Sequence, residues 1–347
     1  MKMNQLGRTD MMVSSYCLGT MTFGTQTDEA GGHAQMDRAL DAGINFVDTA
    51  EMYPVNPISA ETVGLTETIL GNWNAKTGRR KDYILATKHS GEGQGFVRDG
   101  APISSKTIRE TVESSLKRLQ TDYIDLYQFH WPNRGSYMFR KNWTYDPSGM
   151  RAEDVRADML DCLEALQAEV DRGTIRAFGL SNESAWGTAQ WLRLSEQHDL
   201  PRVASVQNEY SLMCRLYDTD MAEMSVAEDV GLLAFSPLAA GYLTGKYQNG
   251  AVPAGSRMDI NGSLGGRKTE RAFEAVQAYL DVAEKHGLDP VHMALAWCDT
   301  RPFMCSNIFG ASTTEQLDRI LSGLDVTLSD EVVADLDAAH QTHPMPY

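Results

Sequence analysis

The chain has 347 residues, of which 31 are lysine or arginine and 47 are aspartate or glutamate, so its formal net charge is −16. A hydrophobic fraction of 42% with 22% charged residues indicates a folded globular protein and excludes an intrinsically disordered one. The acidic balance argues against nucleic acid as the main partner, because phosphate backbones are bound by surfaces rich in lysine and arginine. A small anionic ligand remains open, since a few local cations suffice to bind it.

The sequence indicates neither a membrane segment nor a metal site. No apolar run approaches the roughly 18 residues that span a bilayer, and the N-terminal residues lack the apolar core of a signal peptide. The 5 cysteines form no Cys-x-x-Cys or Cys/His cluster, which speaks against a disulfide framework or a zinc site. We therefore expect a cytoplasmic, reduced, metal-free enzyme.

Short apolar runs alternate with longer amphipathic stretches along the whole chain. Each apolar run has the length of a buried strand and is bounded by polar or turn-forming residues. The predicted strands are Tyr16–Leu18, Asn45–Asp48, Tyr83–Thr87, Ile124–Phe129, Ile175–Leu180, Ala204–Gln207, Leu232–Phe235 and Met304–Phe309.

The stretches between the strands carry apolar residues at helical spacing, as Ile108, Val112 and Leu116 do. This spacing places one apolar stripe on each helix, ready to pack against a sheet. The clearest predicted helices are Ser104–Leu119, Asp154–Val170, Thr269–Lys285, Asp289–Cys298, Thr313–Leu321 and Ser329–Ala339.

Strands that alternate with helices predict a parallel sheet, because parallel neighbours need helical crossovers. This α/β pattern fits a single closed (β/α)8 TIM barrel better than an open sheet, which would normally carry Gly-x-Gly-x-x-Gly after its first strand. The stretch after Leu18, Gly19-Thr20-Met21-Thr22-Phe23-Gly24, does not match that motif. No repeat, low-complexity tract or linker divides the chain, so we predict one domain over residues 1–347.

Three predicted connections are unusually long, and each follows a strand: Met52–Ser59, His89–Pro102 and Trp131–Arg151. In a barrel these βα-loops gather over the C-terminal face, where active sites are built. The third loop is rich in aromatic residues, of which Trp131 and Trp143 are candidates for the substrate pocket. The alternative is an insertion without a functional role and with a small core of its own, but a position over the barrel mouth favours contact with substrate.

Ionisable side chains fall at or just beyond the ends of three consecutive predicted strands. They are Asp48, Tyr53, Lys88 and His130. Burying a charge costs about several kcal/mol unless it is paired, so these side chains are expected to converge and satisfy one another. Singly, such an Asp often caps a helix and such a His is often structural, but their joint occurrence on one rim favours a common site.

Together these residues have the chemistry of a proton donor for a carbonyl group. The free pKa of tyrosine, near 10, is too high for an efficient acid at neutral pH, but a neighbouring ammonium would lower the pKa of Tyr53. A carboxylate would keep Lys88 charged, and His130 could orient the carbonyl or relay the proton. The set predicts a general acid for reducing C=O to C–OH that lacks only a hydride source.

At these residues the sequence resembles the aldo-keto reductase superfamily, and the resemblance runs in order from Leu6 to Leu328. It implies a (β/α)8 barrel, NADPH as cofactor, and Tyr53 as the acid with three supporting residues. The family segments are Asn45–Tyr53, Ala86-Thr87-Lys88 and Gln128–Pro132, and similarity to the bacterial Tas-type branch comes through Glu51–Val55, Gly64–Thr68 and Ser115–Tyr123.

The resemblance assigns the nicotinamide site to the ends of later strands. Ser181, Asn182 and Gln207 match positions that hydrogen-bond the carboxamide. Tyr210 matches the ring that stacks on the nicotinamide, and a core aromatic is the alternative for it.

The phosphate site is assigned to the segment after Phe235, where small residues let the backbone approach a pyrophosphate. Lys246 and Arg257 match cations near the adenosine phosphate, and they favour NADPH over NADH because NAD sites commonly place an acidic group on the ribose. Arg319 stands where some relatives hold the adenine through a Glu-Asn pair. The remaining positions matched to the cofactor are Gly19, Thr20, Met21, Gln26, Asp48, Phe235, Ser236, Pro237, Leu238, Ala239, Ala240, Gly241, Gly310, Ser312 and Gln316.

Three functions are compatible with these residues. We expect an NADPH-dependent reductase whose partner is a small-molecule carbonyl compound, with the oligomeric state, including a homo-oligomer, left open. A cofactor-binding regulator resembling the potassium-channel β-subunits is the alternative, although those relatives tend to carry Asn where His130 stands. A barrel isomerase or aldolase with Lys88 as a Schiff-base amine leaves the nucleotide-like segments unexplained.

Overall fold

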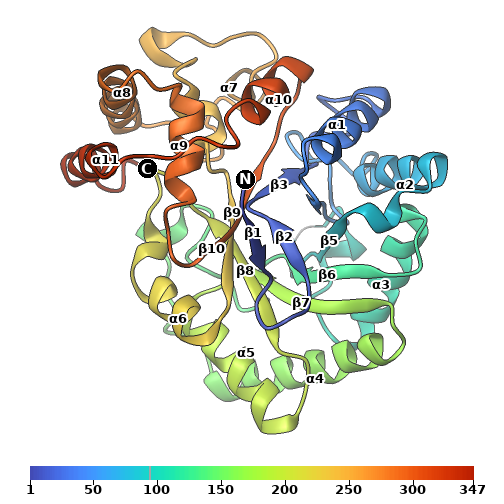
Figure 1. Cartoon of the computed structure of the whole chain (residues 1–347). Coiled ribbons are helices and arrows are strands. Elements are labelled where there is room, and N and C mark those ends of the chain that lie inside the picture. The colour runs from blue at the N-terminus through green and yellow to red at the C-terminus, as the bar shows by residue number, and fades with distance from the viewer. Residues whose placement is uncertain (94) are drawn as a thin grey trace.

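The computed structural model describes residues 1–93 and 95–347, and its centre is a closed barrel of parallel strands (Figure 1). The strand order around the barrel follows the chain, and the last strand closes onto the first, which confirms the predicted (β/α)8 architecture. The barrel strands are β3 (Tyr16–Gly19), β4 (Phe46–Asp48), β5 (Ile84–His89), β6 (Ile124–Phe129), β7 (Ile175–Ser181), β8 (Val203–Glu209), β9 (Gly231–Phe235) and β10 (Met304–Phe309).

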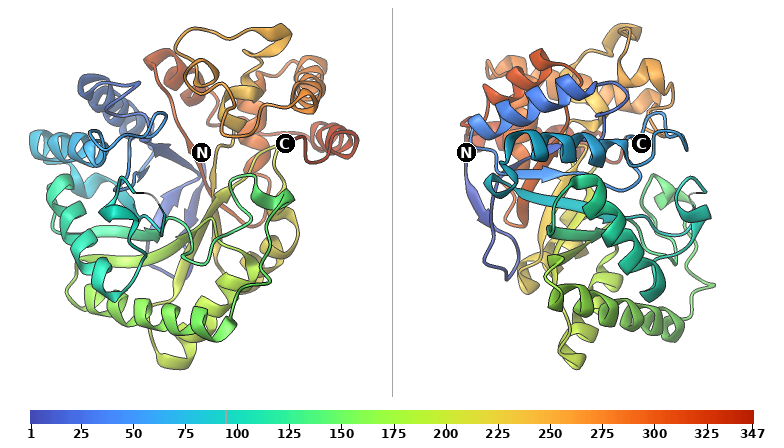
Figure 2. Two further views of the ribbon diagram at one scale, coloured as in Figure 1. Left: turned by 180° about the vertical axis from the view of Figure 1, so that it is seen from behind. Right: turned by 90° about the vertical axis from the view of Figure 1, so that its right-hand side faces the viewer.

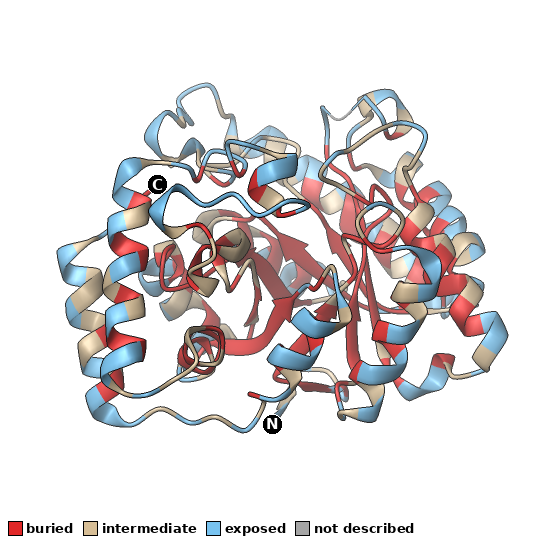
Figure 3. Cartoon of the chain, turned by 90° about the horizontal axis from the view of Figure 1, so that it is seen from above, coloured by how far each residue is buried: buried red, intermediate tan, exposed pale blue. Residues whose placement is uncertain are grey.

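Helices surround the barrel, and their apolar stripes pack on its outer face while their polar faces meet solvent (Figure 3). Several of the predicted helices begin one residue late because their predicted first residue is the N-cap, as Thr269 is for α8. The helices are α1 (Glu29–Asp41), α2 (Leu65–Thr77), α3 (Ser105–Leu119), α4 (Ala152–Asp171), α5 (Ala185–His198), α6 (Asp220–Glu228), α7 (Arg257–Ile260), α8 (Glu270–Lys285), α9 (Pro290–Cys298), α10 (Thr314–Leu321) and α11 (Asp330–Thr342).

One end of the barrel is covered by an N-terminal hairpin that the sequence did not predict. Its strands β1 (Met3–Gln5) and β2 (Met12–Ser14) pair antiparallel and lie across the barrel in Figure 1. The Asn4 side chain donates to the carbonyl oxygen of Cys305 at 2.8 Å, at the start of β10. Leu6 and Val13 belong to the same apolar cluster as Leu126 in the barrel interior, so the hairpin closes the N-terminal end of the core.

The opposite end carries the long connections, which lie at the C-terminal ends of the strands (Figure 2). The loops after β4, β5 and β6 are those that the sequence predicted. A further long connection, residues 236–269, follows β9 and includes the 3-10 helix η5 (Ala239–Thr244) and α7. Among the described residues, no helix has both the length and the apolar content to cross a membrane.

Candidate active site at the C-terminal face of the barrel

Three of the predicted catalytic side chains meet at the ends of β4 and β5. The Lys88 ammonium donates to Asp48 Oδ2 at 2.5 Å, to the carbonyl oxygen of Thr49 at 2.8 Å and to Tyr53 Oη at 3.4 Å. Lys88 is fully buried and Asp48 is 2% exposed, so the ion pair is shielded from water. The strand β5 ends two residues later than the sequence predicted, and its alternation turns Lys88 inward while His89 packs outside against Phe129.

His130 completes this group from the end of β6. Its ring meets that of Tyr53 edge-on, with 5.7 Å between the ring centroids. The His130 Nδ1 atom is buried and has no hydrogen-bond partner among the described residues, whereas its backbone N–H donates to His89 and its carbonyl oxygen accepts from Asn182. The structure therefore brings Asp48, Tyr53, Lys88 and His130 together, as the sequence predicted from their strand-end positions.

The charges of this group follow from burial and from the ammonium. Burial raises the pKa of Tyr53, and the opposing attraction of Lys88 does not cancel it, so the net pKa shift is upward rather than downward as we predicted. The pKa of Lys88 is also raised: burial works against the charge, but Asp48 and Tyr53 together outweigh it. The pKa of His130 falls well below its usual value because of burial and, secondarily, Lys88, so His130 is neutral at neutral pH.

Asp48 also bonds to two amides across the barrel interior, on β6 and β8. Its Oδ1 atom accepts from Gln207 Nε2 at 2.8 Å and from Gln128 Nε2 at 3.1 Å, and Gln207 Nε2 donates as well to Gln128 Oε1 at 3.0 Å. Gln128 is not among the site residues predicted from the sequence. Its position two residues before His130 on β6, which places both side chains on one face, is the signal that would have found it.

The catalytic group opens into a cavity of about 1230 Å³ that runs over the barrel mouth. Tyr53, His130 and Asp48 line it, whereas Lys88 lies beneath them. Most residues that the resemblance matched to a cofactor also line this one cavity: Gly19, Met21, Gln26, Ser181, Asn182, Gln207, Phe235, Ser236, Pro237, Leu238, Ala240, Gly241, Lys246, Arg257, Gly310, Ser312, Gln316 and Arg319.

The part of the cavity bordered by the loop after β9 is basic. Lys246 and Arg257 line it, and neither makes a salt bridge to a described carboxylate. Burial and the neighbouring Arg257 lower the pKa of Lys246, while burial and Arg267 lower the pKa of Arg257. Cations that are held close together without a counter-ion indicate a site for an anion.

The backbone of the same loop has the curvature of an anion-binding nest. Ser236, Ala239, Ala240 and Gly241 all have positive φ angles, of 55°, 49°, 56° and 95°. At Gly241 an added Cβ atom would lie 2.9 Å from Lys246 Cε, so a residue larger than glycine would displace the Lys246 side chain.

The predicted stacking role of Tyr210 is wrong. Its ring is fully buried, stacks on Trp297 with 5.4 Å between centroids, and its hydroxyl donates to Asp218 at 2.5 Å. Side chains alternate between the two faces of a strand, and Tyr210 lies three residues after Gln207, so the two side chains point to opposite faces of β8 and its extension. Tyr210 is thus a core aromatic, which was the alternative given for it above. Phe235 is an aromatic residue that does line the cavity.

Four further predicted positions differ in detail. Thr20 is buried outside the cavity, where its hydroxyl donates to the carbonyl oxygen of Asp48 at 2.8 Å, and Ala239 is likewise fully buried. Trp143 is 63% exposed and lines a separate surface cavity, so its assignment to the substrate pocket is wrong. Arg319 reaches the main cavity, but its guanidinium is paired with Asp289 at 2.8 and 3.0 Å.

Trp131 borders the cavity beside the catalytic group. Its ring lies 4.9 Å from that of His130, centroid to centroid, and its indole nitrogen donates to the carbonyl oxygen of Glu92 at 3.1 Å. A side chain at Gly91 would come within 2.4 Å of the indole, so the loop after β5 packs directly on Trp131. Met52 and Val55 belong to the same apolar group, which gives this end of the cavity an apolar wall.

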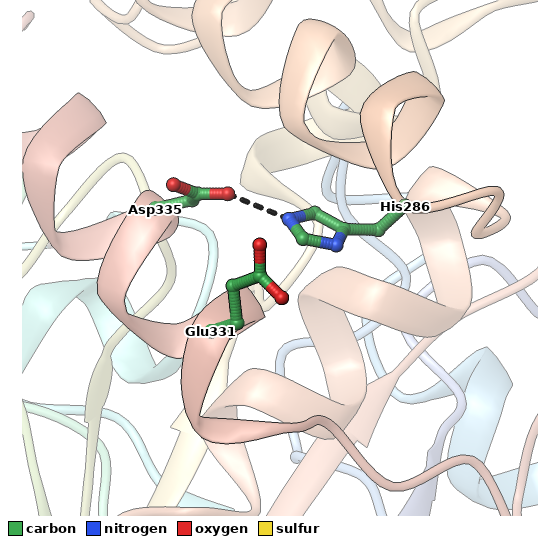
Figure 4. Close-up of side chains that lie close together, drawn as sticks. All are labelled: His286, Glu331 and Asp335. Carbon is green, nitrogen blue, oxygen red and sulfur yellow. Dashed lines mark hydrogen bonds and ion pairs between the residues drawn. The ribbon is translucent and has the colours of Figure 1, made fainter.

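Away from the barrel mouth, one group of potential metal ligands joins α8 to α11 (Figure 4). In the described part of the chain, only His286, Glu331 and Asp335 bring three such atoms within 4.8 Å of one another. Asp335 already accepts from His286 at 2.6 Å and from Lys285 at 2.7 Å. A lysine therefore neutralises this carboxylate, and the group is a salt-bridge network between two helices.

The fold and this site define a barrel oxidoreductase with a buried tyrosine–lysine–aspartate group. The model of the Aldo/keto reductase family matches residues 16–341, and the chain belongs to this family, whose members generally use nicotinamide cofactors. It is 45% identical to Protein tas of Escherichia coli over all of this chain and 99% of that protein. It is 33% identical to the uncharacterized oxidoreductase YrpG of Bacillus subtilis (96% of this chain, 94% of that one) and 31% identical to a probable voltage-gated potassium channel subunit beta of rice, Oryza sativa (99% and 98%).

Proposed function

We propose that the chain is an NADPH-dependent carbonyl reductase that converts small aldehydes or ketones to alcohols. The observation that carries this proposal is the 3.4 Å contact between the Lys88 ammonium and Tyr53 Oη, at the wall of a cavity that is also lined by Lys246 and Arg257, which form no salt bridge among the described residues. The phenol is a proton donor, and the cations suit the phosphates of a nucleotide. One cavity therefore offers the acid and the place for its hydride source.

The residues present fit NADPH. Asn182 Oδ1 is a buried acceptor without a partner, which suits the N–H of a carboxamide. Lys246 and Arg257 suit the 2′-phosphate, and the backbone nest after Phe235 suits the pyrophosphate. When bound, NADPH would supply the hydride that the carbonyl carbon receives, and the carbonyl compound is reduced while the cofactor is oxidised.

The protein's contribution is to hold the carbonyl group and to deliver the proton. Tyr53 Oη gives its proton to the carbonyl oxygen as the C–O bond becomes single. Lys88 stabilises the phenolate that remains, and Asp48 keeps the ammonium charged and fixed. Neutral His130 can donate a hydrogen bond to the carbonyl oxygen without competing as an acid.

The walls near Tyr53 favour substrates with an apolar body. Trp131, Met52 and Val55 border this part of the cavity, and Phe139 is the next aromatic ring along it, with 6.5 Å between its centroid and that of Trp131. We therefore propose aromatic or branched aliphatic carbonyl compounds as the substrate class.

The test is a carbonyl-substrate screen that follows NADPH absorbance, carried out with the unaltered chain and with Tyr53→Phe. The proposal expects turnover by the unaltered chain and at least a 100-fold lower kcat for Tyr53→Phe (about the contribution of a general acid), with NADPH binding changed by less than about threefold. Equal turnover by both proteins would contradict the assignment of Tyr53.

A cofactor-binding regulator is the second candidate, favoured by the similarity to probable potassium channel β-subunits of rice and Arabidopsis thaliana. Stopped-flow mixing of the NADPH-loaded protein with a panel of aldehydes separates the two. Oxidation of the bound cofactor favours the reductase, and a cofactor that stays reduced with every aldehyde favours the regulator.

A further inference from the structure

The side-chain amide of Gln207 presents only an acceptor to the cavity. An amide nitrogen carries two hydrogens, and both hydrogens of Gln207 Nε2 are engaged, with Asp48 Oδ1 at 2.8 Å and with Gln128 Oε1 at 3.0 Å. Gln207 lines the cavity, so Oε1 is the polar atom of its side chain that is left for a ligand.

Asn182 has the same polarity. Its Nδ2 donates to the carbonyl oxygen of His130 at 2.8 Å and to Ser181 Oγ at 3.1 Å, which uses both hydrogens. Its Oδ1 is buried and has no partner in the described part of the chain. Two amides, one just after β7 and one near the end of the neighbouring β8, therefore offer oxygen atoms and withhold N–H groups.

Gln128 lies behind this arrangement. It is fully buried and does not line the cavity. Among the described residues, its side chain bonds to Asp48 and Gln207 alone, donating to the first at 3.1 Å and accepting from the second. If its oxygen were missing, one hydrogen of Gln207 Nε2 would lose its partner, and the amide could turn that hydrogen toward a ligand.

We propose that Gln128 is a positioning residue that fixes Gln207 with its oxygen toward the cavity, so that the site recognises a nicotinamide carboxamide through its N–H groups. This inference rests on the proposed function, because it names how the proposed cofactor is selected. The same three side chains join the carboxamide site to the Asp48–Lys88 pair, so the cofactor and the proton donor share one hydrogen-bond network.

A cofactor analogue without the N–H groups provides the probe. In 3-acetylpyridine adenine dinucleotide phosphate a methyl group replaces the amide nitrogen, so the analogue keeps the carbonyl oxygen but donates no hydrogen bond. Titration calorimetry gives the Kd of this analogue and of NADP⁺ without any turnover. The ratio of the two values measures how strongly the site requires the N–H groups.

Gln128→Met removes both polar atoms at nearly constant length. We expect the unaltered chain to prefer NADP⁺, and we expect this preference to fall about fivefold in Gln128→Met, which is the equivalent of about one hydrogen bond. In Gln128→Glu, burial and the neighbouring Asp48 carboxylate keep the new side chain protonated, so its O–H can replace the donor to Asp48 while its other oxygen remains the acceptor for Gln207. The preference should then stay within about twofold of the unaltered chain. Gln128→Leu repeats the test if the methionine variant does not fold.

Two controls separate positioning from a general loss of packing. Leu126 lies two residues earlier on the same face of β6 and is fully buried, so Leu126→Val perturbs the packing of the interior but removes no polar atom, and it should leave the preference unchanged. In a Gln207→Leu background, Gln128→Met should have no further effect, because its target is gone.

The outcomes distinguish the inference from the function on which it rests. An unchanged preference in Gln128→Met, or an equal loss in Leu126→Val or Gln128→Glu, overturns the role of Gln128 while NADP⁺ binding by the unaltered chain still supports the proposed function. If the unaltered chain does not bind NADP⁺ at all, the proposed function fails, and the inference fails with it.

Discussion

Replacing Lys88 by methionine tests the electrostatic basis of the proton donor. The ammonium lies 3.4 Å from Tyr53 Oη. At an effective dielectric constant of about 20, the attraction between the ammonium and a phenolate at that distance is about 5 kcal/mol. If about half of the proton has left Tyr53 in the transition state, about 2.5 kcal/mol of this is lost, which lowers kcat by roughly 70-fold.

The assay is the steady-state reduction of an aromatic aldehyde, followed by NADPH absorbance. Lys88→Met should lower kcat by about two orders of magnitude while the Kd of NADPH changes little, because Lys88 does not line the cavity. The variant also leaves Asp48 buried without its counter-ion, at a cost of about 3–5 kcal/mol in folding. The double variant Lys88→Met/Asp48→Asn should recover much of that stability but not the activity, and a kcat within threefold of the unaltered chain would refute the reasoning.

Three further predictions follow from buried groups. Burial and Arg98 lower the pKa of His89 to about 3, so this side chain is neutral in the folded protein. Below about pH 6.5 the unfolded chain binds a proton at His89 that the folded protein does not, and the free energy of unfolding falls by about 2 kcal/mol down to pH 5. In urea titrations, His89→Gln should lose that part of the pH dependence. Arg257→Gln should raise the KM for NADPH about tenfold or more and leave that for NADH nearly unchanged. In Gly71→Ala the new Cβ atom would lie 2.0 Å from a backbone oxygen of α3, so the free energy of unfolding should fall by about 1–3 kcal/mol. In the control Gly149→Ala the new Cβ atom meets no atom within 4 Å, so stability should not change.

Most of the barrel was predictable from the sequence because its strands are short, apolar and fully buried. β6 and β10 have the bounds that their apolar runs predicted. The ends of β5 and β8 were missed because polar residues such as Lys88 and Asn208 continue each strand beyond the end that its apolar run predicted. The N-terminal hairpin was missed because its strands have three residues each and little apolar character of their own.

The catalytic group was predictable for a related reason: a charge at the end of a buried strand needs a partner, and parallel strands end on one rim. An uncharged amide does not require an ion-pair partner, so the sequence gives no comparable signal for Gln128, which lies within a buried strand. Tyr210 was misplaced because a motif match ignores the alternation that turns it away from Gln207. The upward shift in the pKa of Tyr53 depends on the extent of burial around it, which only the folded chain reveals.

We propose that Tyr53 gives a proton to a carbonyl group that takes hydride in the same cavity. Single-turnover stopped-flow fluorescence follows this step, with NADPH bound before an aldehyde is added. We expect a rapid loss of NADPH fluorescence in the unaltered chain and a rate at least about 100-fold lower in Tyr53→Phe, with the bound cofactor signal unchanged before mixing. Equal rates in the two proteins, or no loss of fluorescence in either with any carbonyl compound, would contradict it.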